Sequence, residues 1–180
     1  MSNKSNRWLR PVLWALIALL IGAVFWWTDT AKAGPPPLRP AHERATLVLV
    51  EKAARKLTLF KHDRVLASYK IALGFSPKGD KFREGDGRTP EGRYEIDRRN
   101  PQSSFHLSLR INYPRADQRA AAIAAGRNPG GDIFIHGQPN GYRGPGLKRD
   151  WTSGCAAVTD AEIREIWSLV AIGTPVEIRP

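Results

Sequence analysis

The sequence is poor in the residues that build metal centres and disulfide frameworks. Its 180 residues include one cysteine, Cys155, and four histidines, at positions 42, 62, 106 and 136. A single cysteine excludes an internal disulfide and a zinc site made of several cysteines. No two histidines have the close spacing of metal ligands, and the His-Glu-x-x-His motif of zinc peptidases does not occur. We therefore expect no metal and no other cofactor.

Acidic side chains are also few beside the basic ones. Lysine and arginine number 28 against 17 acidic residues, which gives a net charge of +11. Hydrophobic residues make up 42% of the chain, a globular proportion that excludes a largely disordered chain and a membrane protein with several spans. The length allows one domain, or two at most. A basic balance first suggests nucleic acid as a partner, but the N-terminus argues against it.

The first 33 residues indicate an export signal or a membrane anchor. Residues 1–10 hold three basic side chains and no acidic one, residues 11–27 are uncharged, and a small-x-small site ends at Ala33. As a helix, the uncharged run would be about 26 Å long, against ~30 Å for the hydrocarbon core of a bilayer. Cleavage after Ala33 and retention as a single anchor in the inner membrane are both open. In either case we expect the remainder in the periplasm or cell envelope.

Beyond this leader, the chain keeps 24 basic and 16 acidic residues, a net charge of +8. Outside the cytoplasm, such a surface meets the cell wall, with its free carboxylates, and lipid head groups. A solvated basic surface with no specific partner is the alternative. Export makes nucleic acid an unsuitable partner.

Proline content and apolar patterning organise the exported part. The proline-rich residues 34–44 predict an extended linker, and we expect one folded domain over residues 45–180. Within it, runs of strand type cover residues 46–50, 56–61, 65–73, 93–97, 105–113, 132–136 and 174–179. The stretch 74–92 is rich in glycine, proline and charge, which predicts a long surface loop.

Two short helices are expected beside these strands. Residues 117–125 are alanine-rich and stop at a glycine, as at a helix C-cap. Thr159 and Glu162 form a capping box, and the apolar residues that follow recur at helical spacing. The predicted architecture is mainly β with two short helices, preceded by an N-terminal apolar helix.

The stretch from His136 to Cys155 carries the residues suited to chemistry. A strand ends at His136, a glycine-rich loop follows, and Thr152-Ser153-Gly154-Cys155 precedes the second helix. An imidazole can take the proton of a thiol and return it to a leaving group. The N–H groups of Ser153, Gly154 and Cys155 are candidates for an oxyanion hole. The alternative is that Cys155 is a small buried residue and His136 caps a strand.

These residues resemble a known signature. His136-Gly137, a glycine-rich loop and then Ser/Thr-x-Gly-Cys is similar to the motif of the L,D-transpeptidase catalytic domain, of YkuD type. The segment GRTPEGRY, residues 87–94, resembles the family's upstream Thr-Pro-x-Gly-x-Phe/Tyr segment. The resemblance covers about residues 46–178. It implies a small β-sandwich-like domain in an exported cell-wall enzyme, which agrees with the strand pattern.

The resemblance also implies roles for single residues. It makes Cys155 the nucleophile, His136 the general base and acid, and the carbonyl of Gly137 the group that orients the imidazole. Ser153 and Gly154, with Cys155, match the oxyanion-hole positions. The implied substrate is the peptidoglycan stem tetrapeptide, cut between meso-diaminopimelate and D-alanine through a thioester. The acyl group then passes to the amine of another stem, to a lipoprotein lysine or to water.

Two positions depart from the usual Ser-His-Gly-Cys-[Ile/Val]-Arg pattern. Ser153 replaces the histidine and Ala157 replaces the arginine. A divergent branch of the family is similar to this sequence in other segments, Phe105-His-Leu-Ser-Leu, Tyr113-Pro114 and Asp150-Trp151-Thr152. That branch includes an amidase-like member that releases lipoprotein from peptidoglycan. Hydrolysis is therefore an alternative to transfer, and a wall-binding module without catalysis is a further one.

Four further residues are candidates for binding the substrate. His106 could replace the missing second histidine, or it could be an ordinary strand residue. Arg143 and Arg149 could bind stem-peptide carboxylates, or they could be solvated loop charges. Trp151 could stack over the site or fill the core.

Overall fold

The computed structural model describes residues 34–144 and 149–180. The predicted leader, residues 1–33, lies outside the described residues. Within the described part of the chain, no helix combines the length and the apolar character that crossing a membrane requires. Residues 35–180 form one compact unit.

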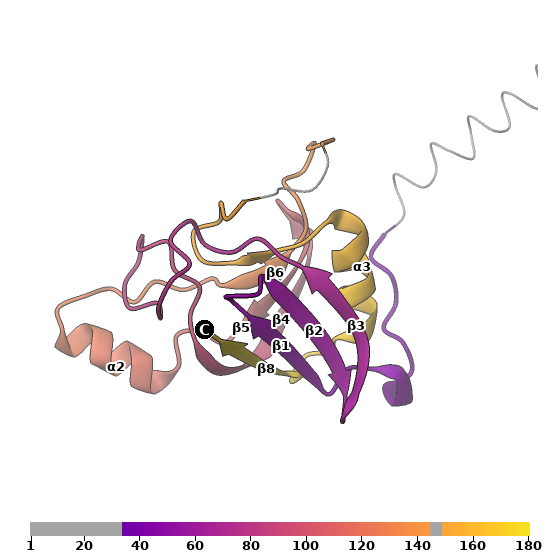
Figure 1. The fold of residues 1–180 in the computed structure, drawn as a ribbon, viewed down its shortest axis with the longest axis horizontal. Helices are drawn as coiled ribbons and strands as arrows, with labels where there is room; N and C mark the ends of the chain where they lie inside the picture. Colours follow the sequence, from indigo (N-terminus) through magenta and orange to yellow (C-terminus); the bar gives the residue numbers. More distant parts are fainter. Residues whose placement is uncertain (1–33, 145–148) are drawn as a thin grey trace, which may run out of the picture. The chain divides into compact units, whose positions relative to one another are not determined.

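Among the described residues, eight strands form one continuous sheet in the order β3-β2-β1-β8-β4-β5-β6-β7 (Figure 1). The pairs β1–β8 and β6–β7 are parallel, and the other neighbours are antiparallel. The strands are Leu47–Glu51 (β1), Lys56–Lys61 (β2), Arg64–Lys70 (β3), Gly92–Ser103 (β4), His106–Ile111 (β5), Phe134–His136 (β6), Ala156–Ala157 (β7) and Pro175–Arg179 (β8).

Strand β4 joins the two halves of this sheet. Its first residues pair with β8, and the part from Ile96 onward pairs with β5. The sequence predicts only residues 93–97 as this strand. The observed strand continues to Ser103 and includes Pro101, which cannot donate to a ladder. In the structure, Pro101 falls where the register shifts between Asn100 and Ser103, so its missing N–H interrupts a ladder that is already irregular.

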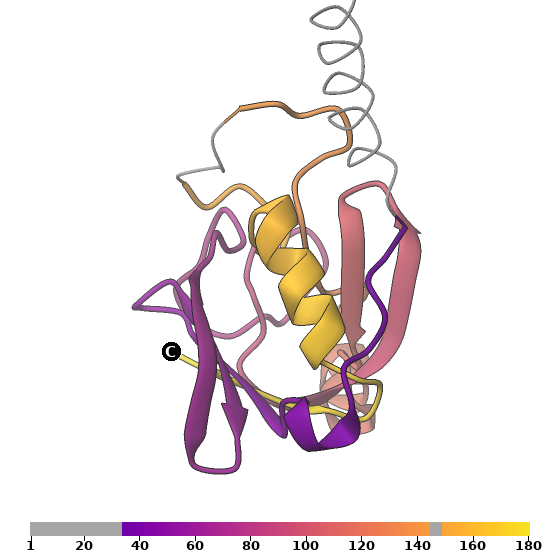
Figure 2. The same ribbon diagram turned by 90° about the vertical axis from the view of Figure 1, so that its right-hand side faces the viewer.

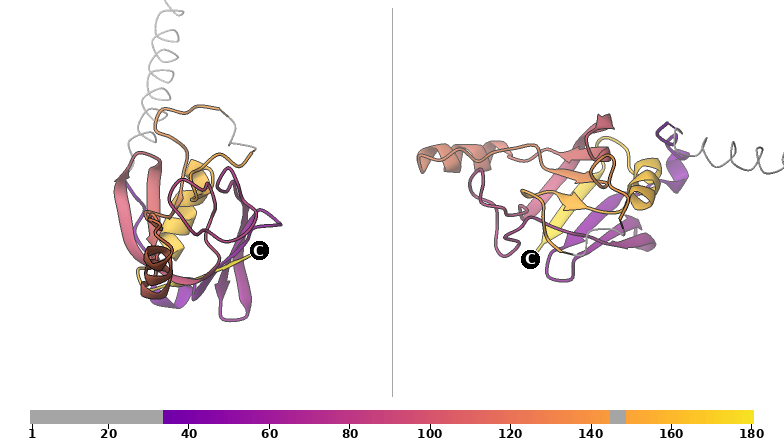
Figure 3. Two further views of the ribbon diagram at one scale, coloured as in Figure 1. Left: turned by 90° about the vertical axis from the view of Figure 1, so that its left-hand side faces the viewer. Right: turned by 90° about the horizontal axis from the view of Figure 1, so that it is seen from above.

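Helix α3 (Asp160–Leu169) lies between the β1–β3 part of the sheet and the β4–β5 hairpin (Figures 2 and 3). Its inward residues Ile163 and Ile166 have no exposed surface. The predicted capping box is present: Thr159 Oγ1 accepts from the N–H of Glu162, and the Glu162 carboxylate accepts from the N–H of Thr159. This helix therefore supplies the apolar face that both parts of the sheet cover.

The helix predicted over residues 117–125 is α2 (Ala116–Ala124), and its one buried residue is Ala122. It extends away from the sheet (Figure 1). The proline-rich segment after residue 34 contains a short 3-10 turn, η2 (Ala41–Glu43). The N–H groups of Arg39 and Ala45 donate to the carbonyls of Ser168 and Leu169 at 2.8 and 2.9 Å. This segment is thus fixed to the C-terminal end of α3.

The predicted loop at residues 74–92 is held in shape by a buried ion pair. The side chains of Lys81 and Asp86 are each 3% exposed and meet at 2.8 Å. The Asp86 carboxylate also accepts from the backbone N–H groups of Phe82, Arg83 and Arg88. Burial alone would raise the pKa of Asp86, but these hydrogen bonds outweigh it and lower the pKa to about 2.

We predict that Asp86→Asn lowers the free energy of unfolding by about 3 kcal/mol at neutral pH, because it leaves the buried Lys81 ammonium unpaired. The folded-state pKa lies below the unfolded value of 3.8. The stabilisation is therefore present above about pH 4 and declines as the pH falls toward 2. Urea unfolding across this range measures it. Asp63→Asn, at an exposed turn position, is the control; equal effects of the two changes would contradict the prediction.

Candidate active site

The β6–β7 pairing brings together two residues that lie nineteen positions apart in the chain. In this parallel ladder Ile135 pairs with Ala156 and His136 with Ala157. His136 therefore ends β6, and Cys155 directly precedes β7. Both side chains line one cavity of about 340 Å³. The predicted pair of His136 and Cys155 shares a site in the structure.

The imidazole of His136 is fixed in one tautomer. Its Nδ1 lies 2.7 Å from the carbonyl oxygen of Gly137, which can only accept, so Nδ1 carries the hydrogen. The lone pair of the neutral ring is then at Nε2. The carbonyl of Gly137 occupies the orienting position that the resemblance implies for it.

Two aromatic rings cover the imidazole. The centroids of Phe105 and Trp151 lie 4.5 and 5.7 Å from that of His136. His136 is 3% exposed. Burial lowers its pKa, and the hydrogen bond to Gly137 opposes this shift only in part. The ring is therefore a neutral base at neutral pH.

The thiol of Cys155 is also uncharged at neutral pH. Cys155 keeps part of its surface open to the cavity, but the protein packed around the thiol raises its pKa to about 11. The N–H of Phe134 points at Sγ from 3.4 Å, and the thiol donates to the carbonyl of Asp132 at 3.6 Å. The resting pair is thus a thiol and an imidazole, and the proton must move as the sulfur attacks.

The turn before Cys155 requires glycine at position 154. Gly154 has a φ of +141°, and a Cβ built there would lie 2.7 Å from the carbonyl oxygen of Arg88. Thr152 Oγ1 accepts from the N–H of Gly154 and donates to the carbonyl of Cys155. The Gly154 N–H is therefore engaged within the turn. The oxyanion-hole role of Ser153 and Gly154 stays a prediction.

A polar part of the lining of this cavity comes from the β4–β5 hairpin. It contains the side chains of Asn100, Ser103, Ser104 and Ser108. Ser108 pairs with His136 across the β5–β6 ladder. Sequence reasoning missed these four residues. Their only local signal is the alternation in Phe105-His-Leu-Ser-Leu, which places Ser108 on one face of a strand.

The structure brings one of the four predicted substrate-binding residues into this cavity. Trp151 lines it. His106 does not line the cavity. It begins β5 with a φ of +65°, and its N–H donates to Asn140 Oδ1 at 2.9 Å. Arg143 is exposed on the loop, and Arg149 lines a different cavity. Binding of substrate by these residues stays a prediction, and part of the loop from Gly137 to Gly146 lies outside the described residues.

The sequence over residues 45–178 matches the family model of the L,D-transpeptidase catalytic domain, YkuD. The chain belongs to the L,D-transpeptidase catalytic domain family. YafK of Escherichia coli strain K12, a protein classed with the L,D-transpeptidases, is 31% identical over 130 residues, which cover 68% of this chain and 46% of YafK. The match to the YkuD model confirms the resemblance drawn from the two sequence motifs.

Solved structures agree with this family fold. The helical cell shape determining protein Pgp2 of Campylobacter jejuni is 26% identical, with a TM-score of 0.57 over 86% of this chain and 54% of its own. An L,D-transpeptidase from Xylanimonas cellulosilytica, 16% identical, has a TM-score of 0.51 over 78% of this chain and 63% of its own. The mainly β YkuD-type fold with two short helices is confirmed. The chain spans about half the length of the relatives named here.

We predict that Cys155 of this YkuD domain reacts slowly with iodoacetamide at pH 7. With a pKa of about 11, the thiolate fraction and the alkylation rate rise roughly tenfold per pH unit between pH 7 and 10. Mass spectrometry of the labelled full-length protein measures the rate, with Cys155→Ala as the unlabelled control. A rate that is already constant above pH 7, and that falls in His136→Ala, would instead indicate a resting thiolate–imidazolium pair.

Proposed function

We propose that this protein performs L,D-transpeptidase acyl transfer on peptidoglycan through a Cys155 thioester. The observation that supports it best is the joint position of His136 and Cys155 in one cavity, with Nδ1 of the imidazole committed to Gly137. This leaves the lone pair of Nε2 to act as the base. The family of the chain supports peptidoglycan as the substrate class.

The first half of the reaction cleaves the stem peptide. Sγ of Cys155 attacks the carbonyl carbon of meso-diaminopimelate that is bonded to the nitrogen of D-alanine, while Nε2 of His136 takes the thiol proton. The N–H groups of Ser153 and Cys155 hold the oxygen that becomes negative. The C–N bond to D-alanine then breaks, and the imidazolium returns the proton to the leaving amine. A thioester remains on Cys155.

The second half transfers the acyl group. An amine of another stem peptide, or a lysine of a wall-linked lipoprotein, attacks the thioester as His136 takes a proton from it. The C–S bond breaks, an amide forms, and the proton returns to the sulfur. With water as the acceptor, the same steps give hydrolysis. Ser153 and Ala157 replace the usual histidine and arginine. A hydrolase or amidase is therefore the second candidate function.

A cell-shape role also follows from this proposal. The structure of Pgp2 aligns with 86% of this chain, and Pgp2 is a helical cell shape determining protein. A change in the crosslinks or stem lengths of the wall alters the network that sets the shape of a cell. We therefore assign this protein to remodelling of the wall.

Incubation of full-length protein with tetrapeptide muropeptides and with lipoprotein-linked sacculi tests the function. We expect new dimers or exchanged terminal residues by mass spectrometry, and their loss in Cys155→Ala and His136→Ala. Products that contain no new amide bond would indicate the hydrolase or amidase alternative. Product formation by a folded Cys155→Ala protein would overturn the thioester mechanism, and binding without any product would leave a wall-binding module.

We also propose that residues 1–33 export the chain to the periplasm or cell envelope, as a cleaved signal or an inner-membrane anchor. Alkaline phosphatase fused after Pro180 should then be active in the producing bacterium and inactive when residues 1–33 are removed. The mass of the purified fusion distinguishes cleavage after Ala33 from retention. A full-length fusion that stays inactive while the cytoplasm holds intact fusion protein would refute export.

A further inference from the structure

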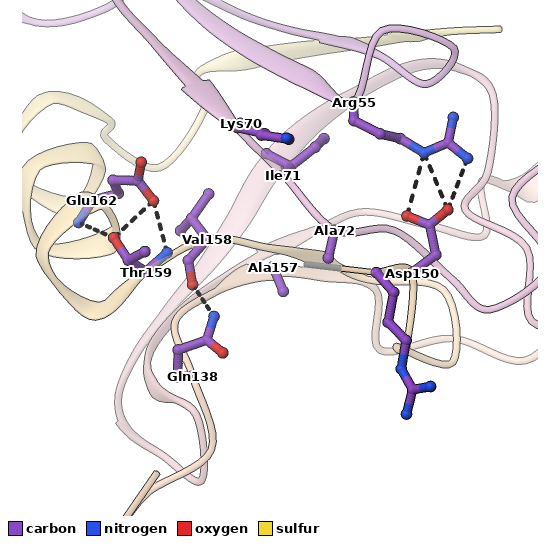
Figure 4. A pocket seen from close by; sticks show the side chains of 11 residues that line it. Arg55, Lys70, Ile71, Ala72, Gln138, Asp150, Ala157, Val158, Thr159 and Glu162 are labelled. Carbon is purple, nitrogen blue, oxygen red and sulfur yellow. Dashed lines mark hydrogen bonds and ion pairs between the residues drawn. The ribbon is translucent and has the colours of Figure 1, made fainter. Parts of the chain in front are cut away.

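A second cavity has a volume of about 260 Å³ (Figure 4). Its lining includes Gln138 and Ala157, each two residues beyond a catalytic residue. In an extended chain, two residues span about 7 Å, and side chains two apart face the same side. Ala157 therefore places this cavity about two peptide units from Cys155. The neighbours Asp150 and Trp151 line the second and the catalytic cavity respectively.

The acidic side chains at this second cavity are already engaged. The Asp150 carboxylate accepts from Nε and Nη2 of Arg55 and from the N–H of Leu73. Glu162 Oε2 accepts from the N–H and the hydroxyl of Thr159. Figure 4 shows the contacts of Asp150 with Arg55 and of Glu162 with Thr159. These carboxylates are therefore poor partners for a cationic ligand.

Two basic side chains at the same cavity have no such partner. Lys70, at the end of β3, and Arg149 are both exposed and both line it. Within residues 34–144 and 149–180, neither side chain has a hydrogen bond or an ion pair. Since Asp150 is paired with Arg55, the remaining charges are those of Lys70 and Arg149 against Glu162, and this net positive charge favours a ligand that carries carboxylates.

Gln138 adds an unused acceptor. Its side chain is 6% exposed, and its Nε2 donates to the carbonyl of Val158. Since a carbonyl only accepts, the amide must present its nitrogen there, which turns Oε1 away from Val158 (Figure 4). No donor in the described part of the chain reaches Oε1. A buried acceptor without a donor is unfavourable by about 1–3 kcal/mol, so a ligand N–H at this point is stabilising.

We propose that the second cavity binds an acidic peptide segment, with its carboxylates against Lys70 and Arg149 and a peptide N–H on Gln138 Oε1. This inference rests on the proposed function, because it makes the second cavity the site for the carboxylate-bearing part of a stem peptide whose reacting end lies at Cys155. The basic surface expected from the sequence would then have a specific use at these two residues.

Binding to full-length Cys155→Ala protein tests the proposal apart from turnover. The probes are the stem tetrapeptide and the same peptide with its carboxylates amidated, titrated by calorimetry. We expect amidation to weaken binding about 10-fold, as for two exposed charge contacts. In Cys155→Ala with Lys70→Ala and Arg149→Ala added, the free peptide should bind as weakly as the amidated one.

The matched control adds Arg64→Ala and Arg119→Ala instead. These residues are exposed, do not line the cavity, and remove the same charge, so the 10-fold preference should persist. Equal loss of the preference in both backgrounds would mean a general charge effect and overturn the proposal. Equal affinity for both probes in the Cys155→Ala protein would overturn it as well.

Nuclear magnetic resonance provides an independent readout. The side-chain amide signals of Gln138 should shift when the free tetrapeptide binds, and this shift should be lost with Lys70→Ala and Arg149→Ala. Shifts confined to Ser153 and its neighbours would place the peptide in the catalytic cavity alone and refute the proposal. Tight binding with these shifts, but no Cys155-dependent product from the wild-type protein, would refute the proposed function and leave the second site standing.

Discussion

The parallel pairing of β6 with β7 is the constraint on which the site depends. Neither strand is long: β6 has three residues and β7 has two. In their register His136 pairs with Ala157, so Cys155, directly before β7, lies next to Phe134, whose N–H points at its sulfur. A slip by one residue would turn Cys155 to the opposite face of the sheet. Ile135 and Ala156 pair in this ladder, are 2% and 4% exposed, and pack into the hydrophobic core, which stabilises the register.

Burial gives the two reacting groups their resting state. The same lack of solvent that lowers the pKa of His136 raises that of Cys155, so each group is neutral when no substrate is present. A neutral thiol is protected from non-specific oxidation and alkylation, since both reactions require the thiolate. The arrangement favours a nucleophile that becomes reactive only when a carbonyl is in place to receive it.

Much of the fold could be predicted from the sequence, because its signals are local. The capping box at Thr159 and the apolar spacing after it predict α3 closely, and strands β1, β2 and β8 follow the apolar runs. The length of β4 could not be predicted, since Pro101 argues against a strand and only the partner β5 shows that the ladder resumes. The motifs predicted His136, Cys155 and Trp151 as site residues. The polar residues of the β4–β5 hairpin escaped prediction because the sequence does not show which cavity a hairpin lines. The second cavity escaped prediction because it is assembled from segments distant in the chain.

The contact between Gly154 and the carbonyl of Arg88 links the two motifs physically. Arg88 belongs to the loop at residues 74–92, whose shape depends on Lys81 and Asp86, and Gly74 in that loop donates to Thr89 Oγ1. A fragment from Asp132 to Val158 would contain the side chains of His136 and Cys155 and the hydrogen bonds of Thr152 within the turn, but not the Arg88 carbonyl that lies against Gly154. The smallest unit that can keep the nucleophile in its present conformation therefore begins some eighty residues before it, and any redesign of the catalytic turn has to include that earlier loop.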